Sequence, residues 1–81
     1  MASETRTAFV TSVTTDLGID KEITSVVEML TEEQVEARRQ GVIDEMQAGT
    51  MKAMEIETSR GWVAVRGDHI VAVALIRVEP A

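Results

Sequence analysis

The spacing of hydrophobic residues changes near Gly49. Before Gly49 the apolar positions recur every three or four residues, which is typical of amphipathic helices; after it they alternate with polar positions, as in strands. The pattern predicts a single α+β domain over residues 1–81. Two or three N-terminal helices (about 4–48) would pack on a C-terminal three-stranded antiparallel β-meander (about 51–79).

The first segment, residues 5–17, carries two signals. Phe9, Val13 and Leu17 follow one another at intervals of four, which fits a helix, and Gly18 suits the left-handed position after a helix end, with Ile19 supplying the accompanying hydrophobic contact. A run rich in threonine favours a strand instead. We expect a helix here and keep a strand over residues 7–14 as the alternative.

Two further helices are predicted before Gly49, which would end the second of them. Asp20 would cap the first, and Thr31 would cap the second through a capping box with Gln34. The two stripes point roughly 120–140° apart at 100° per residue, so a break at Thr31 lets both face one core. Gly41 would mark a close helix contact. The stripes consist of Ile23, Val26, Val27 and Leu30, and of Val35, Val42, Ile43 and Met46.

Three strands follow, separated by the turn pairs Ser59-Arg60 and Gly67-Asp68. The first turn would pair Ile56 with Val63 and Met54 with Val65. The second would pair Val65 with Ile70, Val63 with Ala72 and Trp62 with Val73. This register gives one wholly apolar face for the helices and one mixed face. The apolar face comprises Met54, Ile56, Val63, Val65, Ile70, Ala72, Ala74 and Ile76.

The last strand, residues 70–78, is apolar on both faces although the meander leaves it at an edge. Long apolar edges invite pairing with another chain. We expect a non-enzymatic protein–protein interaction module that forms a homo-oligomer, with a dimer favoured. Cover by the N-terminal segment or by another protein is the alternative. The expected interface comprises Trp62, Val71, Val73, Leu75, Ile70 and Ile76.

Catalytic and metal-binding chemistry have little support. The chain has one histidine, no cysteine and no tyrosine. His69, beside the second turn, could act as a base oriented by a neighbouring aspartate, but no nucleophile accompanies it and an exposed turn residue is the simpler interpretation. Asp16, Asp20 and Glu22 lack the spacing of a calcium loop. We therefore expect no catalytic residue, no metal and no cofactor.

The net charge of −6 lies in the first half, where residues 1–50 carry ten acidic and four basic side chains. This balance argues against nucleic acid, which needs a positive footprint. No apolar run is long enough to span a membrane, and a cytoplasmic location is expected. The second functional hypothesis is an acidic inhibitor or adaptor for a basic partner, with nucleic-acid mimicry as a weaker variant. Its surface would be Glu32, Glu33, Glu36, Asp44 and Glu45.

The segments "LTEEQVEARRQ" and "GDHIVAVALIRVE", in a short chain rich in Ala, Val, Glu and Arg, resemble small uncharacterised proteins of actinobacteria and their phages. The resemblance is one of overall style. It implies a cytoplasmic accessory protein that binds a host protein, and it transfers no functional residue.

Overall fold

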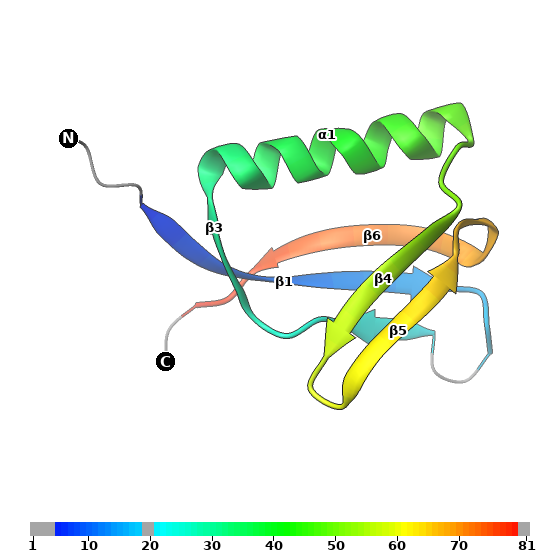
Figure 1. Cartoon of the computed structure of the whole chain (residues 1–81), viewed down its shortest axis with the longest axis horizontal. Coiled ribbons are helices and arrows are strands. Elements are labelled where there is room, and N and C mark those ends of the chain that lie inside the picture. The colour runs from blue at the N-terminus through cyan, green and yellow to red at the C-terminus, as the bar shows by residue number, and fades with distance from the viewer. Residues whose placement is uncertain (1–4, 19–20, 80–81) are drawn as a thin grey trace.

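The computed structural model describes residues 5–18 and 21–79. Within them it has six strands, one α-helix and one short 3-10 helix (Figure 1). In chain order these are β1 (Arg6–Thr15), β2 (Glu22–Thr24), β3 (Glu28–Thr31), α1 (Glu32–Ala48), β4 (Ala53–Thr58), β5 (Gly61–Arg66), η1 (Gly67–His69) and β6 (Ile70–Arg77). The prediction of N-terminal helices on a three-stranded meander is therefore wrong.

β1 is the central strand of a sheet that we call sheet A. It pairs antiparallel with β2 and β3 along one edge and with β6 along the other. The expected helix over residues 5–17 is wrong, and the alternative strand is confirmed. An interval of four is a multiple of the strand period of two, so Phe9 and Val13 lie on one face of β1 as they would on a helix.

The expected helix over residues 20–30 is also wrong, because β2 and β3 pair with successive parts of β1. Between them the N–H of Ser25 donates to the carbonyl of Thr11, and the N–H of Thr11 donates to Ser25 Oγ, each at 2.8 Å. Ile23 therefore lies in β2 and Leu30 in β3, so both residues belong to sheet A and not to a helix. The expected roles of Asp20 and Ile19 lie outside the described residues.

The helix expected after Thr31 is confirmed as α1. The Thr31 side chain accepts a hydrogen bond from the N–H of Gln34, whose side chain accepts one from the N–H of Thr31. Gly49 adopts a left-handed φ of 67° and ends the helix. No residue of α1 is buried. The prediction of a close helix contact at Gly41 is wrong, since nothing lies within 4 Å of a Cβ built there.

The expected hairpin at Ser59-Arg60 is confirmed: β4 and β5 form a second, two-stranded sheet in which Ile56 opposes Val63. The expected turn at Gly67-Asp68 is wrong. These residues form η1, and the following strand crosses to sheet A to pair with β1. The N–H of Gly67 donates to the carbonyl of Lys52, and a Cβ on Gly67 would collide with the main chain of Met51, so the backbones approach too closely for another residue.

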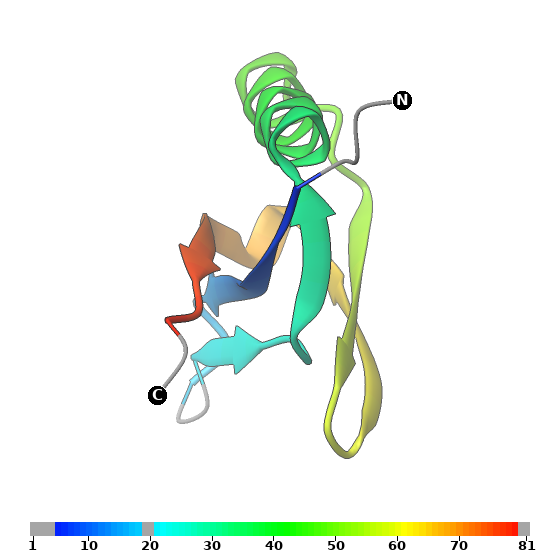
Figure 2. The same ribbon diagram turned by 90° about the vertical axis from the view of Figure 1, so that its left-hand side faces the viewer.

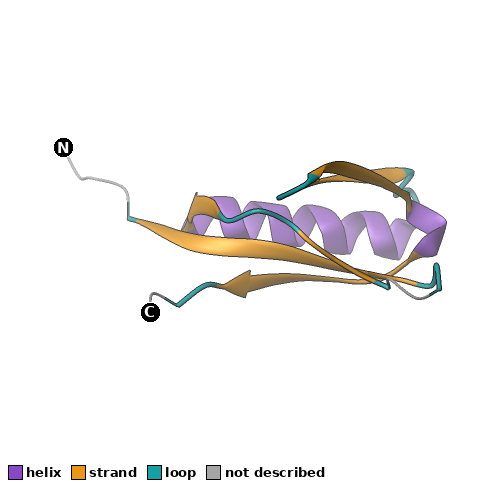
Figure 3. Ribbon diagram, turned by 90° about the horizontal axis from the view of Figure 1, so that it is seen from below, coloured by secondary structure: helices purple, strands orange, loops and turns teal. Residues whose placement is uncertain are grey.

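The core lies between sheet A and the β4–β5 hairpin (Figure 2). Its buried members are Val13, Ile56 and Val65, with Ile23, Met54, Ile70 and Val73 packed around them. We call the face of sheet A that carries Val13 and Val73 the inner face. Figure 3 shows β1 and β6 side by side, with the helix and the hairpin on one side of them. The predicted pairing of β5 with β6 is therefore wrong, because β6 pairs with β1 instead.

Candidate interaction surface

One edge of β6 is open. Val78 donates its N–H to the carbonyl of Ala8, and the register then makes Val10–Ile76 and Ser12–Ala74 the hydrogen-bonded pairs of β1 and β6. In an antiparallel ladder the residues between such pairs point their main-chain groups the other way. The N–H and C=O groups of Val73, Leu75 and Arg77 therefore face away from β1, where no strand of the described residues pairs with them.

Most of this edge lacks the residues that usually block pairing, and the charged Arg77 lies at its end. Between Ile70 and Ile76 there is no charge and no proline. The irregularity in the β1–β6 pairing lies at the beginning of β6, beside Val71, and leaves the rest of the strand regular. Val71 is 61% exposed.

The outer face of sheet A is also uncovered along β6, where Ala72, Ala74 and Ile76 are exposed, whereas Ser12 on β1 is only 5% exposed. Cross-strand partners share a face. Every second β1–β6 pair therefore lies on the outer face, and the pairs between them lie on the inner face. No helix or strand of the described residues packs on it (Figure 2). It carries no charge at its centre, and Ile76 is 48% exposed. The members are Val10, Ser12, Thr14, Ala72, Ala74 and Ile76.

A groove of about 730 Å³ separates α1 from the inner face of sheet A. Val42 and Ile43 line it from the helix, Val73 and Leu75 from β6, and Met54 from β4. Protein interiors are close-packed, and an apolar space of this size is unusual for a small domain. Apolar side chains of both α1 and sheet A therefore line this groove.

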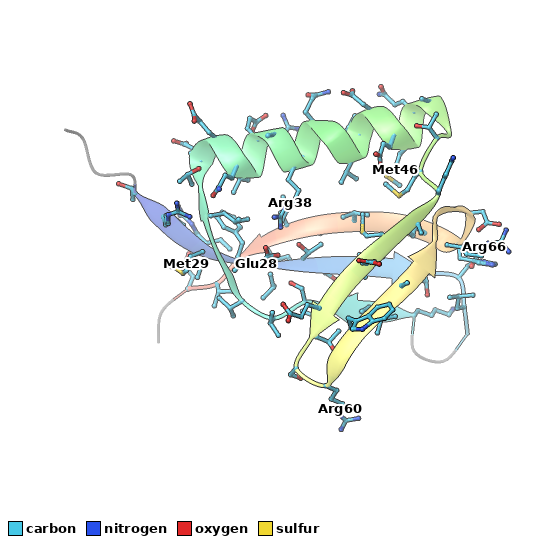
Figure 4. All side chains as sticks on the ribbon, viewed as in Figure 1. Glu28, Met29, Arg38, Met46, Arg60 and Arg66 are labelled. Atoms are coloured by element: carbon cyan, nitrogen blue, oxygen red, sulfur yellow. The ribbon has the colours of Figure 1, made fainter. Side chains whose placement is uncertain are left out.

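Arg38 crosses this groove. Its guanidinium points from α1 toward the sheet in Figure 4 and donates to both carboxylate oxygens of Glu28 on β3, at 2.9 and 3.3 Å. Met46 also points down from the helix (Figure 4) but remains 40% exposed. The ion pair therefore lies beside an unfilled apolar space.

The chain exposes more surface than its size predicts. Its accessible surface is 6176 Å², whereas a folded monomer of its mass, 8.9 kDa, exposes roughly 4,800 Å². The excess of roughly 1,400 Å² exceeds the ~800 Å² that one partner buries in a standard protein–protein interface. The radius of gyration agrees, at 13.6 Å against about 11.7 Å expected for this length.

The residues expected to form one interface are spread over several surfaces. Trp62 is 70% exposed on the hairpin, a different sheet from β6. Val73 and Leu75 face the groove, Ile70 packs at the core, and Ile76 lies on the outer face. Sequence reasoning missed the groove and exchanged the two faces of β6. The Ala-Val alternation after Ile70 could have signalled that the small residues faced away from the core.

The acidic residues of α1 are exposed, and two of them have local partners. Arg39 donates to Glu36, with Nη2 2.6 Å from Oε1. This hydrogen bond and the positive charge of Arg39 lower the pKa of Glu36. Asp44 accepts from Gln40 at 2.8 Å. Glu32, Glu33 and Glu45 are exposed on the same helix. No contact in the described residues singles this helix out as a binding surface.

His69 is oriented by a distant residue. Its Nδ1 lies 2.9 Å from Oδ1 of Asp16, at the far end of β1, while the neighbouring Asp68 instead pairs with Arg66 at 3.4 Å. Ser59 lies at the opposite end of β5, roughly 20 Å away at 3.3 Å per residue. Ser59 is therefore too far away to act as a nucleophile beside the Asp16–His69 pair.

The described part of the chain holds neither a candidate metal site nor a membrane-spanning helix. No group of three or more His, Cys, Asp or Glu side chains there could hold a metal ion. No helix there has the length and apolar character needed to cross a membrane.

Comparison with known proteins adds no neighbour. No protein-family model matches the chain, and neither a curated protein nor a solved structure is significantly similar to it.

Proposed function

We propose that the protein is a self-associating interaction module whose dimer forms by antiparallel pairing of β6 with β6 of a second copy. The observation that carries the proposal is the open edge of β6, which is uncharged from Ile70 to Ile76. The excess surface of roughly 1,400 Å² leaves room for the ~800 Å² that one partner buries in a standard interface, and a second copy offers the same uncharged β6 edge. A two-fold axis gives each copy the same contact.

The pairing also accounts for the inner-face residues of β6. A two-fold axis perpendicular to the sheet keeps inner faces together, so Val73 and Leu75 of one copy would adjoin the same residues of its partner. Both residues line the groove. The partner strand would therefore extend the floor of the groove and remove apolar surface from water. The outer faces would join in the same way.

The first experiment is absolute mass by light scattering after size exclusion, over a wide dilution range. We expect twice the 8.9 kDa of one chain at high concentration. The variant Val71→Lys places a charge on the exposed beginning of β6, where edge lysines oppose pairing, and should shift the protein to monomer. Val27→Lys is the matched control, because Val27 is similarly exposed (55% against 61%) and lies in another segment.

A second variant tests the main chain directly. Leu75→Pro removes an N–H that faces the open edge, a position that edge strands tolerate, and should give a folded monomer by circular dichroism. Val73→Lys is unsuitable as a test because Val73 packs against the core. A monomeric parent at every concentration, or a dimer that survives both Val71→Lys and Leu75→Pro, would rule out this pairing.

A further inference from the structure

Trp62 is the most exposed large hydrophobic side chain in the described part of the chain, at 70%. It lies on the face of the hairpin that points away from the core, since Val65, three residues further along β5, is buried in the core and side chains alternate between the two faces of a strand. Exposing an indole to water costs free energy that burial against a partner would recover. Trp is also a residue type enriched at interface hot spots.

Two carboxylates flank this indole. The hairpin closes with Thr58 opposite Gly61, so the Glu57–Trp62 pair is a non-hydrogen-bonded pair, the kind in which opposing side chains lie closest. Glu55 lies diagonally across, at roughly 7–8 Å. Glu55 and Glu57 are exposed, and no ion pair within the described residues neutralises either of them.

The edge of β5 beside Trp62 is open. The carbonyl of Glu57 on β4 accepts from the N–H of Val26, so the opposite edge of the hairpin meets the rest of the protein. Hydrogen-bonded and non-hydrogen-bonded pairs alternate along β4 and β5, so the N–H and C=O groups of Trp62 and Ala64 point away from β4. β5 pairs with no other strand of the described residues. A strand added there would place alternate side chains on the face that carries Trp62.

We propose that this face, made of Glu55, Glu57, Trp62 and the open edge of β5, binds an extended segment of another protein that carries an arginine or lysine. The segment pairs with β5 through its main chain, its cationic side chain stacks on the indole, and the two carboxylates supply the opposing charge. The net charge of −6 draws a basic segment toward the protein. This site is separate from the β6 edge and does not depend on dimer formation.

The test uses a short peptide, blocked at both ends, in which arginine and threonine alternate. Because the chain has one tryptophan and no tyrosine, intrinsic fluorescence reports on Trp62 alone. We expect a saturable change in emission with the arginine peptide and none with a peptide in which glutamate replaces arginine. Added salt should weaken the binding.

Matched variants locate the site. Glu57→Gln should weaken binding about fivefold, whereas Glu45→Gln, which removes the same charge from the exposed end of α1, should leave it unchanged. Trp62→Ala, followed by calorimetry, should lose at least about tenfold. Val71→Lys should bind like the parent, which separates this result from the test of the β6 edge.

Three outcomes would overturn the proposal. They are no saturable response to the arginine peptide, an equal response to the glutamate peptide, and equal losses for Glu57→Gln and Glu45→Gln. The last would mean that the peptide senses overall charge and not this face.

Discussion

Arg38 on α1 and Glu28 on β3 are joined by two hydrogen bonds, ten residues apart in sequence, on the side of the helix that faces the sheet. α1 buries no side chain of its own, so this pair and the caps at Thr31 and Gly49 are specific polar contacts that fix its position. The helix is therefore held above sheet A at a few points, with the groove between them.

A double-mutant cycle on Glu28→Gln and Arg38→Gln measures this link. The side chains are 39% and 38% exposed, so solvent screens them, and we expect a coupling free energy of about 0.5–1 kcal/mol. Urea unfolding of the four proteins gives the value. Additive effects of the two substitutions would mean that α1 is held by its caps and apolar contacts alone.

Two glycines should respond oppositely to alanine. Gly67→Ala should destabilise the fold severely, because the new Cβ would collide with the carbonyl group of Met51 and the collision is with backbone. Gly41→Ala should stabilise it by about 0.5–1 kcal/mol, since Gly41 lies inside α1 with open space around it. Thermal unfolding of both variants provides the comparison; similar melting temperatures would contradict the close approach at Gly67.

Amide hydrogen exchange should alternate along β6. Ala72, Ala74 and Ile76 direct their N–H groups to β1 and should be protected at every protein concentration. Val73, Leu75 and Arg77 should exchange quickly in dilute samples and slowly in concentrated ones, as β6 pairs with its copy. Two-dimensional NMR at two concentrations resolves these amides. Concentration-independent exchange at all six would be inconsistent with edge pairing.

Glu36 should contribute a small pH dependence. Arg39 lowers the pKa of Glu36 from its ordinary value of 4.5, so the contribution to stability is complete above 4.5 and is lost as the pH falls through the lowered pKa. The difference in urea midpoint between the parent and Glu36→Gln should therefore shrink on acidification below 4.5. Arg39→Gln is the control and should remove the same pH-dependent component. A midpoint difference that stays constant with pH would count against the Arg39 effect.

Local signals predicted the local elements. The Thr31–Gln34 capping box, the end of α1 at Gly49 and the Ser59-Arg60 turn involve neighbouring residues, and all three are present. The N-terminal segments were misassigned because apolar residues spaced by three and four also fit short strands. Which structure forms there depends on pairing between β1 and β3 or β6, and such pairing leaves no signal in a window of a few residues.

The candidate surface was predicted in part. The apolar character of residues 70–78 marked β6 as a strand that needs cover, and β1 supplies that cover along one edge. Which face of β6 meets the core could not be derived, because Val73 and Ala74 are both compatible with burial and the faces depend on a partner distant in sequence. The same error placed Trp62 beside β6, since the predicted register paired it with Val73.

The pairing of β1 with β6 has a consequence for synthesis of the chain. Phe9 opposes Arg77, so the first described strand to emerge from the ribosome bonds with the last. The β4–β5 hairpin can form as soon as its own residues are made, but one edge of the threonine-rich β1 stays unpaired until translation reaches β6. Such long-range pairing slows folding and leaves strand edges open to other chains. The nascent chain therefore keeps one edge of its central strand open until the residues of β6 have been made.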